Sequence, residues 1–325
     1  MRRSEERILT THVGSLIRPK AIRDILAARQ NGVAVDEAYH RSVLTGSVAE
    51  IARRQAETGI DVISDGEFGK SISWSQYVLE RLSGFERRPV APGAADPFAR
   101  GLDRERFPGF YAELDAQDQA QGRFDGGGGA RYESVCVAPI AYTGHDALER
   151  DIGNFKAALA KVDVADGFLP VAAPASAIPD RRNEYYESDE ALVFAIADAM
   201  RVEYRTIAEA GLLVQIDDAR AAVTYDRMVP PATLRDFRKW LGLHMEALNR
   251  ALDGIPPDRV RYHVCWGSWP GPHTSDAPGG ANYLILGRFF SRILQPGNKI
   301  CNRSSPAATA TGRTQCPEPT LPTPV

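Results

Sequence analysis

Two donor side chains in the last third of the sequence have the types and spacing that suit a metal ion. His263 and Cys265 lie two residues apart at the end of an apolar stretch that predicts a strand over residues 260–264. Side chains at positions i and i+2 of a strand point to the same face, so this spacing directs an imidazole and a thiol toward one point. Zinc accepts both kinds of ligand. A buried strand cysteine beside a hydrogen-bonded histidine is the alternative interpretation of the pair.

Acidic residues follow two other predicted strands. Asp65 and Glu67 come after one of them and can both face a cavity. Asp217 and Asp218 end another, and because adjacent side chains of a strand point in opposite directions, only one of these two can enter the site. Paired carboxylates suit the recognition of an ammonium group as well as proton transfer. Surface charge is the alternative for any one of these acids.

Three further residues complete the candidates. Gly14 and Ser15 follow the first predicted strand, where they offer a backbone amide and a hydroxyl to a ligand carboxylate, or simply form a tight turn. His273 lies in a Pro- and Gly-rich stretch after the last predicted strand. It is a third metal ligand, an acid or a solvated side chain.

The elements that must position these residues are short apolar runs alternating with stretches of helical period. The predicted strands span residues 8–13, 60–64, 134–138, 167–172, 212–216 and 260–264. The predicted helices span residues 20–29, 36–58, 74–82, 145–162, 189–210 and 233–252. Repeated strand–helix units predict an α/β fold with a parallel sheet buried on both faces. Polar residues at the carboxyl ends of such strands converge on one face, so they are the first candidates for a site.

Two stretches depart from this alternation. Residues 84–131 contain four prolines and a run of four glycines, and we interpret them as an inserted loop region or small subdomain. A phosphate-binding loop is disfavoured there because no Lys-Ser/Thr pair follows the glycines. Residues 277–325 hold one acidic residue, five basic residues and seven prolines, which predicts an irregular, disordered Pro/Ser/Thr-rich tail. A frameshifted or truncated reading frame would produce so abrupt a change.

Composition narrows the class of partner. The 325 residues include 39 Lys and Arg against 42 Asp and Glu, a net charge of -3, so the chain has no large basic excess for nucleic acid or an anionic membrane. The charged N-terminus lacks the apolar stretch of a secretory signal, and no run of 18 apolar residues occurs. Four cysteines are too few for a disulfide scaffold in a chain of this length. We therefore expect a cytoplasmic protein with small-molecule substrates.

Four motifs carry a resemblance to a known family. They are T-H-V-G-S-L at 11–16 with R-P at 18–19, S-D-G-E-F at 64–68, Q-I-D-D at 215–218, and H-V-C-W-G-S at 263–268 with G-P-H at 271–273. Together they resemble the carboxyl-terminal catalytic domain of the cobalamin-independent methionine synthase family, including its short single-domain relatives. They occur in the family's order within residues 8–276.

The resemblance implies a (β/α)8 TIM-type barrel that binds zinc, with a methyl group passing from a methyl-folate to the zinc-activated thiol of homocysteine to give methionine. It implies a barrel domain over residues 1–276, with the insertion at about 84–131, and an aberrant tail over 277–325. The family's last two strands, which supply a glutamate near the metal and a cysteine ligand in an Asp-Cys-Gly context, have no counterpart after Asp276. We therefore expect a barrel that lacks its last two strands.

The resemblance also assigns roles to the candidate residues. The zinc ligands are His263 and Cys265. The substrate-binding residues are Gly14, Ser15, Asp65, Glu67 and Asp217, of which Asp217 holds the ammonium group. The candidate catalytic residues are Asp218 and His273. Two alternatives remain open: zinc-dependent transfer of a thiol to another electrophile such as an epoxide, and a truncated barrel without activity.

Overall fold

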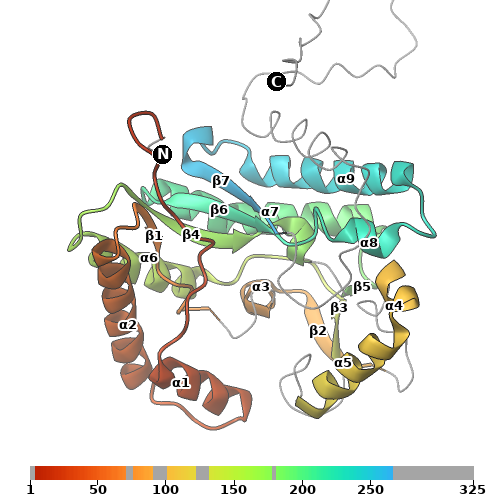
Figure 1. Ribbon diagram of the computed structural model, residues 1–325, viewed down its shortest axis with the longest axis horizontal. Coiled ribbons are helices and arrows are strands. Elements are labelled where there is room, and N and C mark those ends of the chain that lie inside the picture. Colours follow the sequence, from red (N-terminus) through yellow and green to blue (C-terminus); the bar gives the residue numbers. More distant parts are fainter. Residues whose placement is uncertain (1–3, 71–75, 91–100, 122–131, 178–180, 266–325) are drawn as a thin grey trace, which may run out of the picture.

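Four parallel strands form the main sheet in the computed structural model, which describes residues 4–70, 76–90, 101–121, 132–177 and 181–265. They lie in the order β1 (Val62–Ser64), β4 (Asp166–Ala172), β6 (Leu213–Asp218) and β7 (Val260–Val264) (Figure 1). Thr11 adds one parallel bridge to Val62 beyond β1. The strand predicted at 8–13 is therefore reduced to a single bridge, whereas the strands predicted at 60–64, 167–172, 212–216 and 260–264 are present.

One face of the main sheet, which we call the helix face, is covered by long helices. Ile63, Val171 and Ile216 are buried there in a large hydrophobic core to which the four longest helices also contribute side chains. These helices are α2 (Glu37–Glu57), α6 (His145–Leu159), α7 (Asp189–Glu209) and α9 (Leu234–Leu252). Burial of this apolar surface is the main force that holds helices and sheet together.

The opposite face, which we call the inner face, carries a smaller apolar cluster. Val62, Phe168 and Leu213 form this cluster near the start of the strands. Since side chains alternate between the two faces of a strand, Gln215 and Asp217 lie on the same face as Leu213, further toward the carboxyl end of β6. The inner face thus changes from apolar to polar along the strand direction.

The long helices begin at polar residues that satisfy their first backbone amides. Asp36 accepts hydrogen bonds from two amides at the start of α2, and the Ser188 hydroxyl accepts one at the start of α7. Thr233 and Asp236 form a reciprocal capping box at the start of α9. The two remaining predicted helices correspond to α1 (Lys20–Gln30) and α3 (Gln76–Arg81), so all six predicted helices are present.

The prediction that residues 134–138 form the third strand of the main sheet was wrong, because β1 pairs directly with β4. The stretch forms β3 (Tyr132–Cys136) in a separate three-stranded sheet with β2 (Phe85–Pro89), antiparallel, and β5 (Arg181–Asn183), parallel. An apolar run identifies a strand but not its partner, and here the partner β2 comes from the stretch interpreted as an insertion. That stretch also supplies α4 (Leu102–Arg106) and α5 (Pro108–Gln121).

These elements make an α/β fold with a parallel sheet and covering helices. Within the described ranges the main sheet runs from β1 to β7 and does not close into a barrel. One further helix, α8 (Thr224–Met228), follows β6. No helix in the described part of the chain is long and apolar enough to cross a membrane. His273 and the predicted tail at 277–325 lie outside the described residues.

Candidate functional site

Adjacent pairing of β6 and β7 brings two of the predicted site residues side by side. Asp217 and His263 are partners in the parallel register, so both lie on the inner face at the carboxyl ends of their strands. The Cys265 amide donates to the Asp218 carbonyl (3.0 Å), which continues this pairing one step beyond β7. The alternation of side chains then places Cys265 on the same face as His263.

His263 and Cys265 have the donor chemistry of zinc ligands. The thiol of Cys265 is free and partly exposed. Burial, aided by the positive charge of Arg261, lowers the pKa of His263 and favours the neutral imidazole that binds metals. A zinc ion takes four ligands, and no group of three or more His, Cys, Asp or Glu residues that could hold a metal occurs within the described ranges. The described residues therefore fit zinc as two of its ligands.

Asp217 is a half-buried carboxylate whose pKa lies close to neutral pH. Its Oδ1 accepts a hydrogen bond from Gln215 Nε2 (2.8 Å). Burial raises the pKa of Asp217 to about 7, a shift that Lys70 opposes and Glu67 reinforces. Asp217 is the acid of the Asp217–Asp218 pair that faces the inner side of the sheet.

Glu67 lies in a tight turn after β1. Its backbone has a φ of 61°, a left-handed conformation that few non-glycine residues adopt. Its carbonyl accepts a hydrogen bond from Arg18 Nη2 (3.1 Å), and its carboxylate Oε2 pairs with Lys70 Nζ at 3.1 Å. The side chain of Glu67 is 8% exposed. Backbone and side chain are thus both held.

Gly14 packs against this turn. It has a φ of 133°, and a Cβ on it would lie 2.5 Å from Pro170 Cγ and 3.2 Å from Glu67 Oε1. Its amide donates to His12 Nδ1 (3.1 Å), so this amide is already engaged, in contrast to the free donor that the sequence interpretation invoked. The neighbouring Ser15 is exposed. The structure therefore brings Gly14 next to Glu67 and leaves the Ser15 side chain open to solvent.

Asp65 occupies a different environment from Glu67. It is 3% exposed, and its Oδ1 accepts a hydrogen bond from the Glu67 amide (2.9 Å). Burial, reinforced by the charge of Asp151 on α6, raises the pKa of Asp65 to about 7. The sequence interpretation had both acids facing a cavity, whereas the structure places Asp65 beside Asp151.

The carboxylate of Asp218 is used in hydrogen bonds to neighbouring residues. Its side chain is fully buried, and Oδ1 accepts hydrogen bonds from the amides of Arg220 (2.9 Å) and Ala221 (2.8 Å). Its Oδ2 accepts one from the Tyr262 hydroxyl (2.6 Å). These contacts shape the loop after β6 and leave the carboxylate of Asp218 away from the inner face.

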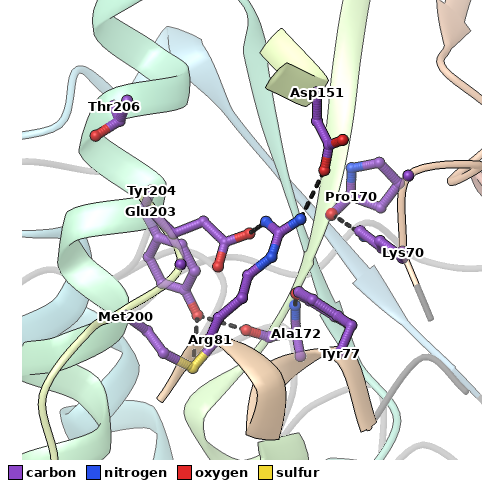
Figure 2. A network of polar contacts seen from close by, with 12 residues as sticks. Lys70, Tyr77, Arg81, Asp151, Pro170, Ala172, Met200, Glu203, Tyr204 and Thr206 are labelled. Carbon is purple, nitrogen blue, oxygen red and sulfur yellow. Dashed lines mark hydrogen bonds and ion pairs between the residues drawn. The ribbon is translucent and has the colours of Figure 1, made fainter. Parts of the chain in front are cut away.

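A buried charge network on the helix face was not anticipated from the sequence. Arg81 on α3 lies between Asp151 and Glu203, with nitrogen–oxygen distances of 2.6 Å to each (Figure 2). Burial alone would lower the pKa of Arg81, but Glu203 and Asp151 outweigh burial and raise it. A lone arginine in a short helix carries no sequence signal for such a role.

Two tyrosines tie this network to the end of β4. The Tyr77 hydroxyl accepts a hydrogen bond from the Ala172 amide (2.7 Å), and the Tyr204 hydroxyl donates to the Ala172 carbonyl (2.5 Å) (Figure 2). Ala172 is the register partner of Asp217. The network therefore holds the strand that borders the candidate site.

No protein-family model matches the chain. It is 23% identical over 287 residues to the methionine synthase of Thermococcus kodakarensis, and this match covers 87% of this chain and 65% of that protein. It is 25% identical over 262 residues to a methionine synthase of Saccharolobus islandicus, and this match covers 80% of this chain and 63% of that protein. The chain thus spans less than two thirds of the length of these curated relatives.

A solved structure shares the fold. The putative vitamin-B12 independent methionine synthase from Listeria monocytogenes has a TM-score of 0.53 at 21% identity, over 81% of this chain and 68% of that one. The relatives named methionine synthase match most of the chain, and the described residues of the four motifs lie at strand ends and in the turns that follow them. In sequence the chain is thus similar to proteins named methionine synthase, and in fold it is similar to a putative vitamin-B12 independent methionine synthase.

Proposed function

We propose that this chain binds an amino acid bearing a thiol and transfers a methyl group to it, homocysteine being the acceptor and a methyl-folate the donor. The observation that carries the proposal is the meeting, at the carboxyl ends of parallel strands, of the buried Glu67 and the half-buried Asp217 with an imidazole and a thiol on the inner face. The named activity of the relatives supports the same reaction class.

The two carboxylates are suited to the ammonium group of the amino acid. Glu67 and Asp217 lie close enough for the charge of Glu67 to raise the pKa of Asp217. A cationic ligand between two carboxylates relieves their repulsion and favours the ionised form of both. Gly14 packs beside Glu67, and any larger side chain there would press on Pro170 and on Glu67 Oε1.

His263 and Cys265 would hold the zinc ion, with further ligands drawn from residues outside the described ranges, for which His273 is a candidate, and from the substrate. When bound, zinc deprotonates a coordinated thiol and so supplies the nucleophile. The neutral ring of His263 would coordinate the zinc ion. Asp217, the register partner of His263, would bind the ammonium group of the substrate together with Glu67. Asp218 acts indirectly in this proposal, by shaping the loop after β6.

The similarity to methionine synthases also leads to a proposal about the fold. We propose that residues 1–276 belong to a (β/α)8-type barrel domain. What supports this proposal is the parallel order Thr11, β1, β4, β6 and β7, with helices between successive strands, which is the arrangement of strands in such a barrel.

Metal content and methyl transfer test the proposal together. Purified chain should contain close to one zinc per molecule and form methionine from homocysteine and a methyl-folate, and Cys265→Ser should lose both. Cys136→Ser is the matched control, because Cys136 is buried in β3 of the second sheet, away from the inner face. Background zinc in the unmodified chain would refute the metal site. If the chain binds zinc and transfers a thiol to an epoxide but transfers no methyl group, the proposed methyl donor is wrong and an epoxide is the electrophile.

A further inference from the structure

Lys70 is a buried lysine at the edge of the candidate site. It is 8% exposed, and its Nζ pairs with Glu67 Oε2 at 3.1 Å. The same ammonium donates to the Pro170 carbonyl and lies 4.5 Å from the centroid of the Tyr77 ring (Figure 2). A buried ammonium is costly unless it is paired, so these contacts indicate a defined position and not a solvated side chain.

The ion pair leaves one oxygen of Glu67 for a ligand. Oε2 is bound to Lys70, whereas Oε1 has no hydrogen-bond partner among the described residues and lies on the side of Gly14. Glu67 is otherwise held through its backbone by Arg18 and Asp65. The side-chain orientation of Glu67 therefore depends on Lys70.

The charges of the cluster match an ammonium ligand. Lys70 acts on Asp217 more strongly than Arg261 does, and it opposes the effect of Glu67 there. Glu67, Asp217 and Lys70 together carry one net negative charge when all three are ionised, which a single ammonium group neutralises. Without Lys70, the buried Glu67 and the half-buried Asp217 would repel each other without the counter-charge that Lys70 supplies.

We propose that Lys70 is a positioning residue for amino-acid recognition, which clamps Glu67 Oε2 so that Oε1 faces the ammonium group of the ligand. This inference rests on the proposed function, in which Glu67 contacts the amino end of the substrate. A purely structural role, tying the turn after β1 to β4 through the Pro170 carbonyl, predicts a different result in the following experiment.

The experiment compares two probes that differ only in the amino group. L-Methionine and 4-(methylthio)butanoate are titrated by calorimetry into the full-length chain and into Lys70→Met, Lys70→Arg and Lys20→Met. The unmodified chain should bind L-methionine more tightly than 4-(methylthio)butanoate. Lys70→Met should reduce the ratio of the two affinities by about tenfold, because Glu67 Oε1 no longer makes its charge-assisted hydrogen bond to the ammonium group. Lys70→Arg should restore most of it. Lys20→Met is the control, because Lys20 pairs with Asp24 on the exposed surface of α1.

Each outcome decides the matter. If Lys70→Met weakens both probes equally, or leaves the preference unchanged, Lys70 is structural and the inference fails while amino-acid binding stands. If the unmodified chain binds neither probe, the proposed function fails and takes this inference with it. Should Lys70→Met not fold, the double variant Glu67→Gln/Lys70→Met, which buries no unpaired charge, is compared with Glu67→Gln. If the double variant and Glu67→Gln show the same preference for L-methionine, Lys70 acts through Glu67 as proposed. A preference that is a further tenfold lower in the double variant would overturn the proposal.

Discussion

Replacing Arg81 with methionine tests the buried network most directly. Arg81 is 5% exposed and pairs at 2.6 Å with Asp151 on α6 and with Glu203 on α7. The substitution keeps most of the side-chain volume but removes the ion-pair partner of the buried Glu203 and leaves the buried Asp151 with Arg150 alone, at 2.8 Å. Removing one partner of a buried pair costs about 3–5 kcal/mol. Because both acids lose the same partner, we expect the free energy of unfolding to fall by at least about 3 kcal/mol.

Urea unfolding followed by circular dichroism measures this loss, with Arg250→Met as a matched control. Arg250 also makes a two-point contact with a carboxylate, that of Asp198, but its side chain is 53% exposed. Exposed ion pairs contribute about 0–1 kcal/mol, so the control should lose little. Adding Asp151→Asn and Glu203→Gln to the Arg81 variant should recover part of the stability. Equal losses for Arg81→Met and Arg250→Met would refute the network as a stabilising feature.

Two further predictions concern the turn after β1 and the residues beside it. Gly14→Ala should lower stability by about 2 kcal/mol or more, because its φ of 133° and a Cβ at 2.5 Å from Pro170 Cγ both oppose a side chain. Gly46→Ala on α2, where nothing lies within 4 Å, should instead stabilise by up to about 1 kcal/mol, and equal melting temperatures for the two variants would contradict this. Asp65 has a pKa of about 7 in the folded chain and about 3.9 when unfolded, so the native state binds the extra proton and its stability falls as pH rises between these values. The stability of Asp65→Asn relative to the unmodified chain should therefore rise from about pH 4 to about pH 7 and then level off, and a constant difference in urea titrations would exclude the shift.

Local patterns were sufficient to locate the strands and part of the site. Apolar runs bounded by polar residues predicted β1, β4, β6 and β7, and strand alternation predicted that only one of Asp217 and Asp218 can face the site. The structure has Asp217 on the inner face, whereas Asp218 is bonded to an amide of its own loop and to Tyr262 of β7. These features depend on the period of a single strand, which a sequence displays directly.

Features that depend on contacts between distant segments were not predictable. The partner of β3 was misjudged because apolar content does not specify pairing, and β2 lies in a stretch without a clear strand pattern. Alternation also ends with β1 at Ser64, since Gly66 and Glu67 both have positive φ values. Asp65 and Glu67 therefore lie in a turn, where strand alternation does not determine the directions of their side chains. Lys70 has no motif, and its burial follows only from the tertiary fold.

The two faces of the sheet are mechanically linked at the end of β4. Tyr77 and Tyr204, on the helix face, hold the amide and carbonyl of Ala172. The next amide, that of Ala173, donates to the Asp217 carbonyl (2.9 Å), so the backbone that carries Asp217 is anchored through the same strand end. Loosening α3 or α7 would therefore change the position of Asp217 without touching any residue of the site. For this reason a variant of the Arg81 network should weaken binding of both probes of the Lys70 experiment together, whereas loss of Lys70 should weaken only the one with an amino group.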